Sequence, residues 1–351
     1  MWIENKVFKE DLENIIQTPC INWKTLQGKT VLVTGGTGLI GSTLINSLLY
    51  ANQELSLGLQ VLALIRNQKK AEQLFFQQLQ ADCPLSFIYG TVENLPDIEG
   101  PVDYIIHGAS PTASAFFVDH PVETIEMNVF GTTNLLHLAN KKKISGFIYL
   151  SSMEVYGSPL SDQLIDETQG TTLDTMSIRS CYPEAKRLCE SLCASYAKEY
   201  GIPTFILRLV QTFGPGVAEN DARVFAEFAR CVLLRKNIVL QTEGTSKRCY
   251  LYTADAVTAI LTVLLSGKSG EAYNAANPET YCSIVEMAQL VATKLAQGSI
   301  QVDFDIDENN EKKFPPPHNL KLSIRKISAL GWKPSTNLLD MYQRLIMGML
   351  P

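Results

Sequence analysis

A glycine-rich turn near the start of the chain constrains the fold more than any other feature. It follows an apolar run at Lys29–Val33, reads TGGTGLIG over Thr34–Gly41, and leads into apolar residues at helical spacing. In such a strand–turn–helix unit the first glycine permits the tight turn, the second lets the backbone approach a pyrophosphate, and the third allows close packing. The N–H groups at the helix N-terminus then face the phosphates. The pattern predicts a dinucleotide site formed by Gly35, Thr37, Gly38, Leu39, Ile40 and Gly41.

Strand-like and helical runs alternate along the first two thirds of the chain. The apolar runs lie at Gln60–Ile65, Ser86–Tyr89, Tyr104–Ile106, Gly146–Leu150 and Pro203–Leu209. Helical stretches at Val122–Asn140 and Tyr182–Tyr200 separate the later runs. This alternation predicts an α/β fold with a Rossmann-type, doubly wound parallel sheet.

The regular alternation of strand-like and helical runs ends after about Gly214, which indicates a second folding unit. Helices are expected at Arg223–Leu234, Asp255–Leu265 and Ile284–Leu295, with a short strand at Asn237–Gln241. We expect an N-terminal extension at 1–27 and a mainly dinucleotide-binding domain at 28–213. Residues 214–351 should form a smaller α/β substrate lobe, from which some segments return to the Rossmann sheet.

Composition narrows the class of protein further. The 351 residues are 46% hydrophobic and carry a net charge of −6, so a polyanionic nucleic acid is not expected as a partner. No run approaches the roughly 18 apolar residues of a membrane span, and charged residues near the N-terminus exclude a secretory signal. The eight cysteines form no CxxC pair, and no metal site is predicted. A cytoplasmic protein is expected.

A tyrosine and a lysine four residues apart form the second chemical motif. Tyr182 and Lys186 lie on one face of the predicted helix. An ammonium group near a phenol favours the phenolate, so Lys186 is expected to lower the pKa of Tyr182 and make it a usable base. The polar segment SSMEVYG, Ser151–Gly157, ends a predicted strand, where open α/β sheets bind their ligands. Abstraction of a proton from a hydroxyl group is therefore feasible at this position.

The second predicted strand ends differently from a typical NAD site. An acidic residue that would bind the ribose is missing, and Arg66 stands there, with Lys69 and Lys70 close behind. An arginine at this position accommodates the 2′-phosphate of NADP. The same arginine exposed beside an adenine is compatible with either cofactor, so NAD and NADP both stay open.

Taken together, these motifs resemble the extended short-chain dehydrogenase/reductase family of nucleotide-sugar epimerases, dehydratases and decarboxylases. The resemblance runs from about Gly28 to Gly348. Within the family it is closest to the UDP-glucuronate decarboxylases, since Ala109–Ser114 (ASPTAS), Arg179–Tyr182 (RSCY) and Glu219–Val224 (ENDARV) are similar to their ASPAS, RACY and MNDGRV runs. The resemblance implies a UDP-sugar substrate, with NAD favoured by the family and NADP by Arg66.

The resemblance also assigns roles to individual residues. Tyr182 would take the O4 proton of the sugar, Ser152 would hydrogen-bond the same hydroxyl, and Lys186 would bind the nicotinamide ribose. Glu154 matches a glutamate beside the reacting C5. Cofactor contacts would come from Gly108, Ala109, Ser110 and Asn128, the last expected at the head of the helix from Val129. Substrate contacts would come from Ser110, Gln211, Arg223 and Arg248, and a homodimer is expected from pairing of the two long helices.

Three departures leave the reaction open. Met153 stands where the dehydratases carry aspartate and the decarboxylases serine, Gln211 replaces an asparagine, and Gly216 replaces an arginine. A decarboxylase-like reaction through a transient 4-keto sugar is the first hypothesis. A 4-epimerase and an NADPH-dependent keto-sugar reductase are the alternatives, and a non-catalytic dinucleotide sensor is a more distant one.

Overall fold

Seven parallel strands form the central sheet of the computed structural model, which describes residues 5–81, 83–112, 114–159, 161–170, 172–306 and 317–350. The strand order is β11-β7-β5-β4-β1-β2-β3. The strands are β1 (Thr30–Thr34), β2 (Gln60–Ile65), β3 (Leu85–Tyr89), β4 (Tyr104–His107), β5 (Gly146–Ser152), β7 (Thr204–Leu209) and β11 (Glu271–Ala275). The chain builds outward from β1 in one direction and then from β4 in the other. This confirms the predicted doubly wound Rossmann-type sheet.

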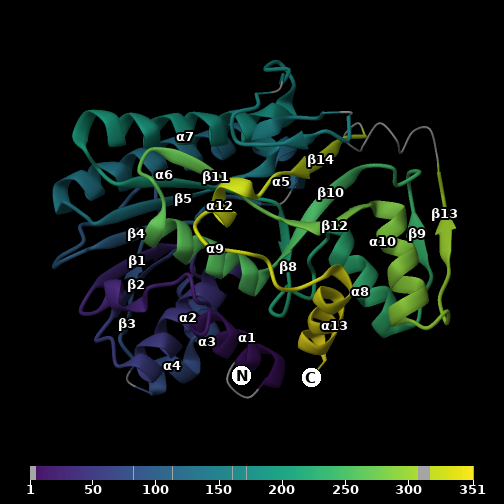
Figure 1. Cartoon of the computed structure of the whole chain (residues 1–351), viewed down its shortest axis with the longest axis horizontal. Coiled ribbons are helices and arrows are strands. Elements are labelled where there is room, and N and C mark those ends of the chain that lie inside the picture. The colour runs from purple at the N-terminus through teal and green to yellow at the C-terminus, as the bar shows by residue number, and fades with distance from the viewer. Residues whose placement is uncertain are drawn as a thin grey trace.

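Helices cover both faces of this sheet, and strand residues alternate between the two cores. On one face Leu32, Ile105, Phe147 and Ile206 pack beneath α6 (Pro121–Lys142) and α7 (Cys181–Tyr200). On the other face their strand neighbours, such as Val31 and Ile106, pack against α2 (Leu39–Leu55) and α9 (Thr253–Ser266). Figure 1 shows α6 and α7 lying side by side. Apolar residues on both strand faces explain the nearly continuous hydrophobic runs.

A second, mixed sheet builds the smaller lobe. Its order is β12-β10-β14-β6, with β8 also paired to β10. The elements are β6 (Leu164–Ile165), β8 (Gln211–Phe213), β10 (Lys247–Tyr252), β12 (Asn277–Ser283) and β14 (Asn319–Leu322). The same part of the chain contains α8 (Val224–Leu234), α10 (Ile284–Leu290), α13 (Leu338–Met349) and the β9–β13 pair (Ile238–Leu240, Val302–Phe304), whereas α5 (Ser114–Asp119) contacts α6 and α12 (Arg325–Ser328) contacts β11. Because β8 follows β7 directly, the chain passes there from the large sheet into the small one.

The N-terminal extension contains a helix that the sequence analysis did not predict. α1 (Lys6–Ile16) buries Phe8, Leu12 and Ile15 and packs against α2, α9 and α13. Its Asp11 accepts a hydrogen bond from Tyr252 at 2.6 Å and pairs with Arg344 of α13 at 2.8 Å. The two ends of the chain therefore lie next to each other (Figure 1).

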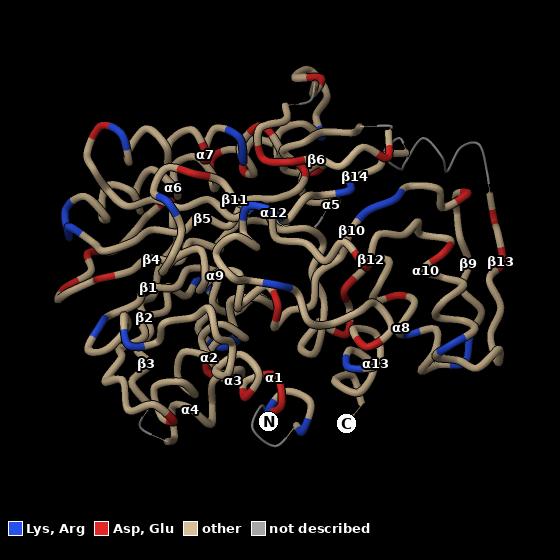
Figure 2. The backbone as a smooth tube through the Cα atoms, viewed as in Figure 1, with Lys and Arg blue, Asp and Glu red and all other residues tan. Residues whose placement is uncertain are grey.

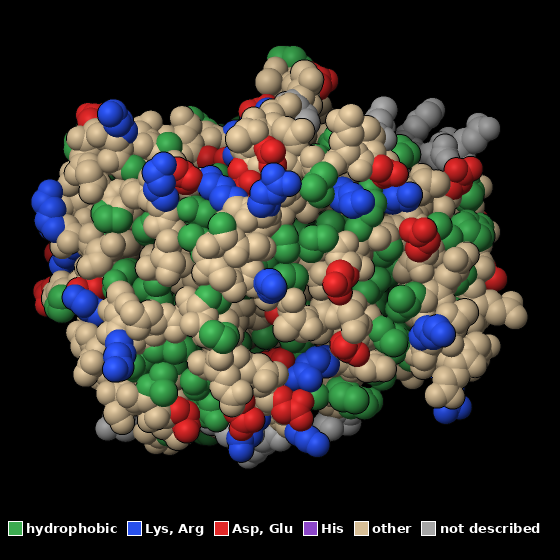
Figure 3. All heavy atoms as spheres, viewed as in Figure 1, with side chains coloured by type: hydrophobic (Ala, Val, Ile, Leu, Met, Phe, Trp, Pro, Cys, Tyr) green, Lys and Arg blue, Asp and Glu red, His purple; other side chains and the backbone are tan. Residues whose placement is uncertain are grey.

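Other boundaries differ modestly from expectation. The helix predicted at Ile284–Leu295 is α10 followed by a π-helical turn at Val291–Leu295. Helix α6 begins at Pro121, so Asn128 lies inside the helix and not at its head. None of the helices over the described ranges combines the length and hydrophobicity that a membrane crossing requires. Basic and acidic side chains are interspersed over the backbone and over the face in view (Figures 2 and 3).

Candidate active site

One cleft of about 630 Å³ gathers the predicted site residues. It lies at the carboxyl ends of β1, β4 and β5, where open α/β sheets bind ligands, and residues of β8 and β10 close its other side. Every predicted residue except Asn128 lines it: Gly35, Thr37, Gly38, Leu39, Ile40, Gly41, Arg66, Gly108, Ala109, Ser110, Ser152, Glu154, Tyr182, Lys186, Gln211, Arg223 and Arg248. Residues up to 213 positions apart in sequence are thus brought together by the sheet edge.

The glycine turn is shaped by close backbone contacts. Gly35 has φ +74°, and a Cβ there would lie 2.7 Å from the carbonyl carbon of Gly108. A Cβ on Gly41 would overlap the carbonyl oxygen of Gly35. Gly38 precedes the first turn of α2, and no side chain of the described residues caps that helix end. The uncapped N-terminus of α2 beside this tight turn fits the pyrophosphate of a dinucleotide.

The end of β4 forms the neighbouring wall of the cleft. The amide of Ala109 donates to the Thr34 hydroxyl at 3.2 Å, which joins the ends of β1 and β4. The Ser110 hydroxyl donates to the side-chain oxygen of Asn128 at 2.9 Å. Asn128 is 1% exposed and in turn donates to the carbonyl of Thr124. Asn128 therefore supports Ser110 from behind the cleft wall.

Ser152, Tyr182 and Lys186, the residues predicted to be catalytic, lie together in the cleft. The Ser152 side chain, at the end of β5, hydrogen-bonds Tyr182 near the start of α7. The Lys186 ammonium lies 5.7 Å from the centre of the Tyr182 ring and donates to the carbonyl of Leu150 at 2.9 Å. A substrate hydroxyl placed against Ser152 and Tyr182 would have both a hydrogen-bond partner and a proton acceptor.

The acid–base properties of this group differ from the sequence expectation. Burial and the nearby Glu154 carboxylate raise the pKa of Tyr182, and the Ser152 hydrogen bond opposes that rise. Burial lowers the pKa of Lys186 to about 8. The expected lowering of the Tyr182 pKa is therefore wrong for the chain alone, because burial and the Glu154 carboxylate both act against the phenolate.

Phe117 is a site residue that the sequence analysis missed. Its ring stacks on that of Tyr182 with centroids 4.2 Å apart and planes 9° apart. Two further contacts join its helix α5 to the start of α7: Cys181 Sγ donates to the Phe117 carbonyl, and Arg179 donates to the Ser114 hydroxyl. No motif marked Phe117, since an aromatic residue in an unassigned loop carries no pattern of its own.

Charged groups surround the other side of Tyr182. Burial raises the pKa of Glu154, and the guanidinium groups of Arg179 and Arg248 oppose that rise. Arg248 comes from β10, and its Nε is buried without a hydrogen-bond partner among the described residues. An unsatisfied buried donor costs free energy, which a bound carboxylate or phosphate would recover. The cleft thus offers one acid and one unsatisfied cation beside the Tyr182 phenol.

Arg223 and Gln211 border the rest of this half. Arg223 precedes the first residue of α8, and its Nε donates to Asp221 at 3.0 Å. Gln211 is the first residue of β8, paired in register with Tyr250 of β10. The Arg223 guanidinium is therefore oriented by an anion of the chain itself, and both side chains reach the cleft.

The opposite rim carries Arg66 and a second residue that sequence reasoning missed. Arg66 follows β2, is exposed, and lines the cleft with Lys70. Glu93, beyond the end of β3, lines it too, and its Oε2 is buried without a partner in the described part of the chain. The sequence search for an acidic residue stopped at the second strand, whereas this one follows the third.

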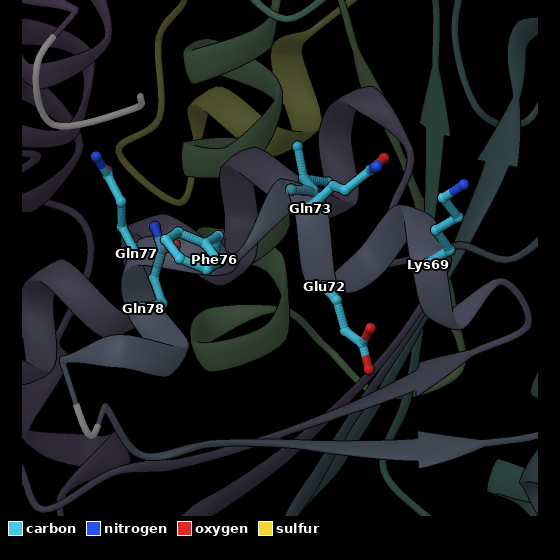
Figure 4. Close-up of a pocket in the computed structure, with 7 residues that line it drawn as sticks. Lys69, Glu72, Gln73, Phe76, Gln77 and Gln78 are labelled. Carbon is cyan, nitrogen blue, oxygen red and sulfur yellow. The ribbon is translucent and has the colours of Figure 1, made fainter.

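A second hollow of about 550 Å³ lies away from the cleft, on α3 (Gln68–Leu74) and α4 (Phe76–Gln80). Figure 4 shows Lys69, Glu72 and Gln77 pointing in different directions, and they do not converge on a common point. The hollow therefore lacks the converging polar groups of the cleft.

Comparison with known proteins identifies the class. Residues 31–276 match the NAD dependent epimerase/dehydratase family. UDP-glucuronic acid decarboxylase 6 of Arabidopsis thaliana is 30% identical over 341 residues, which cover 92% of this chain and 89% of the relative. UDP-glucuronic acid decarboxylase 1 of Xenopus tropicalis is 30% identical over 307 residues, covering 87% and 68%.

Solved structures share the fold. A dTDP-glucose 4,6-dehydratase from Streptomyces venezuelae, solved with NAD bound, superposes with a TM-score of 0.74 at 23% identity and covers 91% of this chain and 96% of its own. UDP-glucose 4-epimerase from Thermotoga maritima gives a TM-score of 0.74 at 20% identity, covering 90% and 97%. The chain is therefore an enzyme of the NAD-dependent epimerase/dehydratase family, which modifies nucleotide sugars.

Proposed function

We propose that this enzyme decarboxylates a UDP-linked uronic acid through a transient 4-keto sugar. The observation that carries the proposal is the position of Glu154 and Arg248 in the cleft that holds Tyr182. Both residues match positions of the UDP-glucuronate decarboxylases. The 30% identity to a UDP-glucuronic acid decarboxylase over nearly the whole chain supports the same reaction.

In this scheme, each residue has a defined task. Tyr182 takes the proton of the C4 hydroxyl, Ser152 hydrogen-bonds that hydroxyl, and the Lys186 ammonium favours the phenolate. Bound NAD supplies the acceptor for the C4 hydride. Arg248 binds the C5 carboxylate, while Arg223 and Gln211 hold the diphosphate.

The chemistry after oxidation follows from the position of the ketone. A carboxylate on C5 lies β to a C4 ketone, so the bond between them breaks with loss of carbon dioxide. The electron pair forms an enolate, and a proton delivered to C5 restores the ketone. Glu154 is placed beside that carbon in the proposed pose. Return of the hydride to C4 closes the redox cycle without net consumption of cofactor.

NAD is proposed as the cofactor, since the family is NAD-dependent. The exposed Arg66 on the cleft rim favours NADP. Calorimetric titration of both cofactors into the wild type and Arg66→Gln tests this assignment. We expect the substitution to weaken NADP binding and leave NAD binding nearly unchanged. NADP preferred by the wild type would overturn the choice of NAD.

A 4-epimerase is the second candidate, and Met153 favours it. This residue is 6% exposed and lines the cleft where the decarboxylases carry serine. In an epimerase, the 4-keto sugar would rotate and receive the hydride on its other face, with its carboxylate retained. The two reactions share Tyr182 and Lys186 and differ only after the ketone forms.

We also infer a homodimer formed through α6 and α7. Their outer surfaces expose Val122, Ile125, Phe130 and Leu188, with 61%, 44%, 54% and 48% of each side chain accessible. Such an apolar surface on two adjacent helices suits pairing with a second copy. Sedimentation of the wild type and Phe130→Glu tests this: a dimer that becomes a monomer is expected, and a monomeric wild type would refute it.

The deciding experiment is incubation of the purified enzyme with UDP-glucuronate and NAD, followed by mass spectrometry and proton NMR. We expect loss of carbon dioxide from the sugar without net NADH. A product of unchanged mass but altered C4 configuration would identify the epimerase, and oxidation of added NADPH with a keto-sugar would identify a reductase. Unreacted UDP-glucuronate would rule out both uronic acid reactions.

A further inference from the structure

A buried ion pair joins the sheet to α7 behind the proposed catalytic residues. Arg208 lies on β7, in register with Ser151 of β5, and Glu190 lies on α7. The Arg208 guanidinium donates to both carboxylate oxygens of Glu190, with Nε–Oε1 at 3.0 Å and NH2–Oε2 at 2.7 Å. The side chains are 14% and 11% exposed. A bidentate pair at this depth fixes orientation as well as distance.

The remaining donor of Arg208 extends the contact to the small lobe. Its NH1 donates to the Tyr156 hydroxyl at 2.8 Å and to the Glu167 carbonyl at 3.1 Å. The Tyr156 hydroxyl donates to Asn274 of β11 at 2.8 Å. Each nitrogen of the Arg208 guanidinium therefore donates a hydrogen bond, which fixes the orientation of the group.

Three consecutive residues of β5 contact α7 at this point. The Leu150 carbonyl accepts from Lys186 at 2.9 Å, and the Ser151 hydroxyl donates to Glu190 at 2.5 Å. The next residue, Ser152, hydrogen-bonds Tyr182. Of these three contacts, only the one between Ser151 and Glu190 is also tied to another strand, through the ion pair of Glu190 with Arg208 on β7. It lies between the two contacts that position the proposed catalytic side chains.

We propose that Glu190 and Arg208 are positioning residues, which hold the end of β5 and the start of α7 at the separation that lets Ser152 and Tyr182 address one substrate hydroxyl. This rests on the roles of Ser152 and Tyr182 in the proposed function. Neither Glu190 nor Arg208 lines the cleft, so neither is expected to touch the substrate.

The pair also acts on Lys186 through charge. Glu190 lies one helical turn beyond Lys186 and favours its ammonium form. His107 of β4 stays neutral near Lys186, because burial and then the ammonium itself lower the pKa of His107 to about 3. The other titratable groups around Lys186 are Tyr182, Cys189 and Cys193 of α7 and Tyr149 of β5. Loss of the Glu190 charge would remove this support of the ammonium form, which lowers the pKa of Lys186.

The test uses Glu190→Gln, which keeps the side-chain shape and removes the charge. We expect kcat to fall about 10- to 100-fold with KM and NAD affinity within twofold, and the alkaline limb of the kcat profile to move to lower pH. The double variant Glu190→Gln/Arg208→Met also removes the unpaired guanidinium, and because it still lacks the Glu190 charge its limb should stay at the lower pH. Asp103→Asn is the matched control, because it removes an ion pair to Lys29 (3.0 Å) at the amino ends of β1 and β4, away from the cleft. This variant should be less stable but should keep the pH profile of kcat unchanged.

A second readout needs no substrate. The Lys186 titration, followed by NMR of isotope-labelled lysine and assigned with Lys186→Met, should shift to lower pH in Glu190→Gln and in the double variant, because both lack the Glu190 charge. This separates the proposal from the proposed function, since it holds even if no uronic acid sugar reacts. An unchanged Lys186 titration in Glu190→Gln, or an unchanged kcat and pH profile, would overturn the positioning role.

Discussion

The proposed cofactor half and the proposed sugar half of the cleft are built in different ways. The cofactor half consists mainly of backbone, where Gly35 and Gly41 pack so closely that no side chain fits. The sugar half consists of side chains from separate elements, Glu154 after β5, Arg223 before α8 and Arg248 on β10. Backbone contacts tolerate no substitution, whereas a side chain can be exchanged while the fold stays intact. The same fold can therefore keep one cofactor and change its sugar chemistry.

The difference predicts how each half responds to mutation. A substitution in the cofactor half should impair the reaction of every sugar substrate equally, because all of these reactions use the same cofactor. In the sugar half, a change should act on some sugars and spare others. Tyr182 lines the same cleft, and the proposed reaction needs it with every sugar. Its loss should therefore lower turnover of all substrates alike.

Tyr182→Phe should have the largest effect. Removal of the phenol hydroxyl eliminates the proton acceptor, and we expect kcat to fall about 100- to 10,000-fold. NAD and nucleotide-sugar affinities, measured by calorimetry, should change little because the ring and its stacking on Phe117 are retained. An activity within threefold of the wild type would assign the base to another group.

Gly41→Ala should rank second. The new methyl group would overlap the Gly35 carbonyl oxygen, and overpacking of this kind costs about 1–3 kcal/mol. We expect NAD affinity to fall about 10- to 100-fold, equally with every nucleotide sugar present. Gly170→Ala is the control, since nothing lies within 4 Å of the added carbon. Equal NAD binding by both variants would show that the turn can relax, and the contrast between the halves would disappear.

Arg248→Lys should affect the sugar half alone. A lysine cannot reproduce a bidentate contact to a carboxylate, and a lost charged hydrogen bond costs about 1.5–3 kcal/mol. We expect KM for UDP-glucuronate to rise at least about 10-fold. Binding of UDP-glucose, which lacks the carboxylate, should not change, and neither should NAD binding. A similar loss for both sugars would place Arg248 on the diphosphate.

The same contrast explains what the sequence could predict. The glycine turn and the apolar strand runs reflect backbone geometry, which depends on local residues, so the doubly wound sheet and the close backbone packing of the glycine turn were predictable. Arg248 and Glu154 were reachable through motif resemblance, but Phe117 and Glu93 were not. Their importance depends on long-range packing that brings unmarked loops to the sheet edge. The direction of the Tyr182 pKa shift was wrong for the same reason, since burial depends on the whole fold.

The pH dependence of kcat should show the smallest effect and tests whether the halves are coupled. Burial lowers the pKa of Lys186 to about 8, so the ammonium form is present below that pH and is lost as the pH rises through it. If the ammonium is required, kcat should halve near pH 8 and fall further above it. Saturating NAD and sugar nucleotide isolate this step from binding. A Lys186→Arg variant, which keeps its charge at every pH, should retain less activity but lose the alkaline limb. Persistence of that limb in the variant would assign it to another group, and Lys186 would then serve cofactor binding without coupling the two halves.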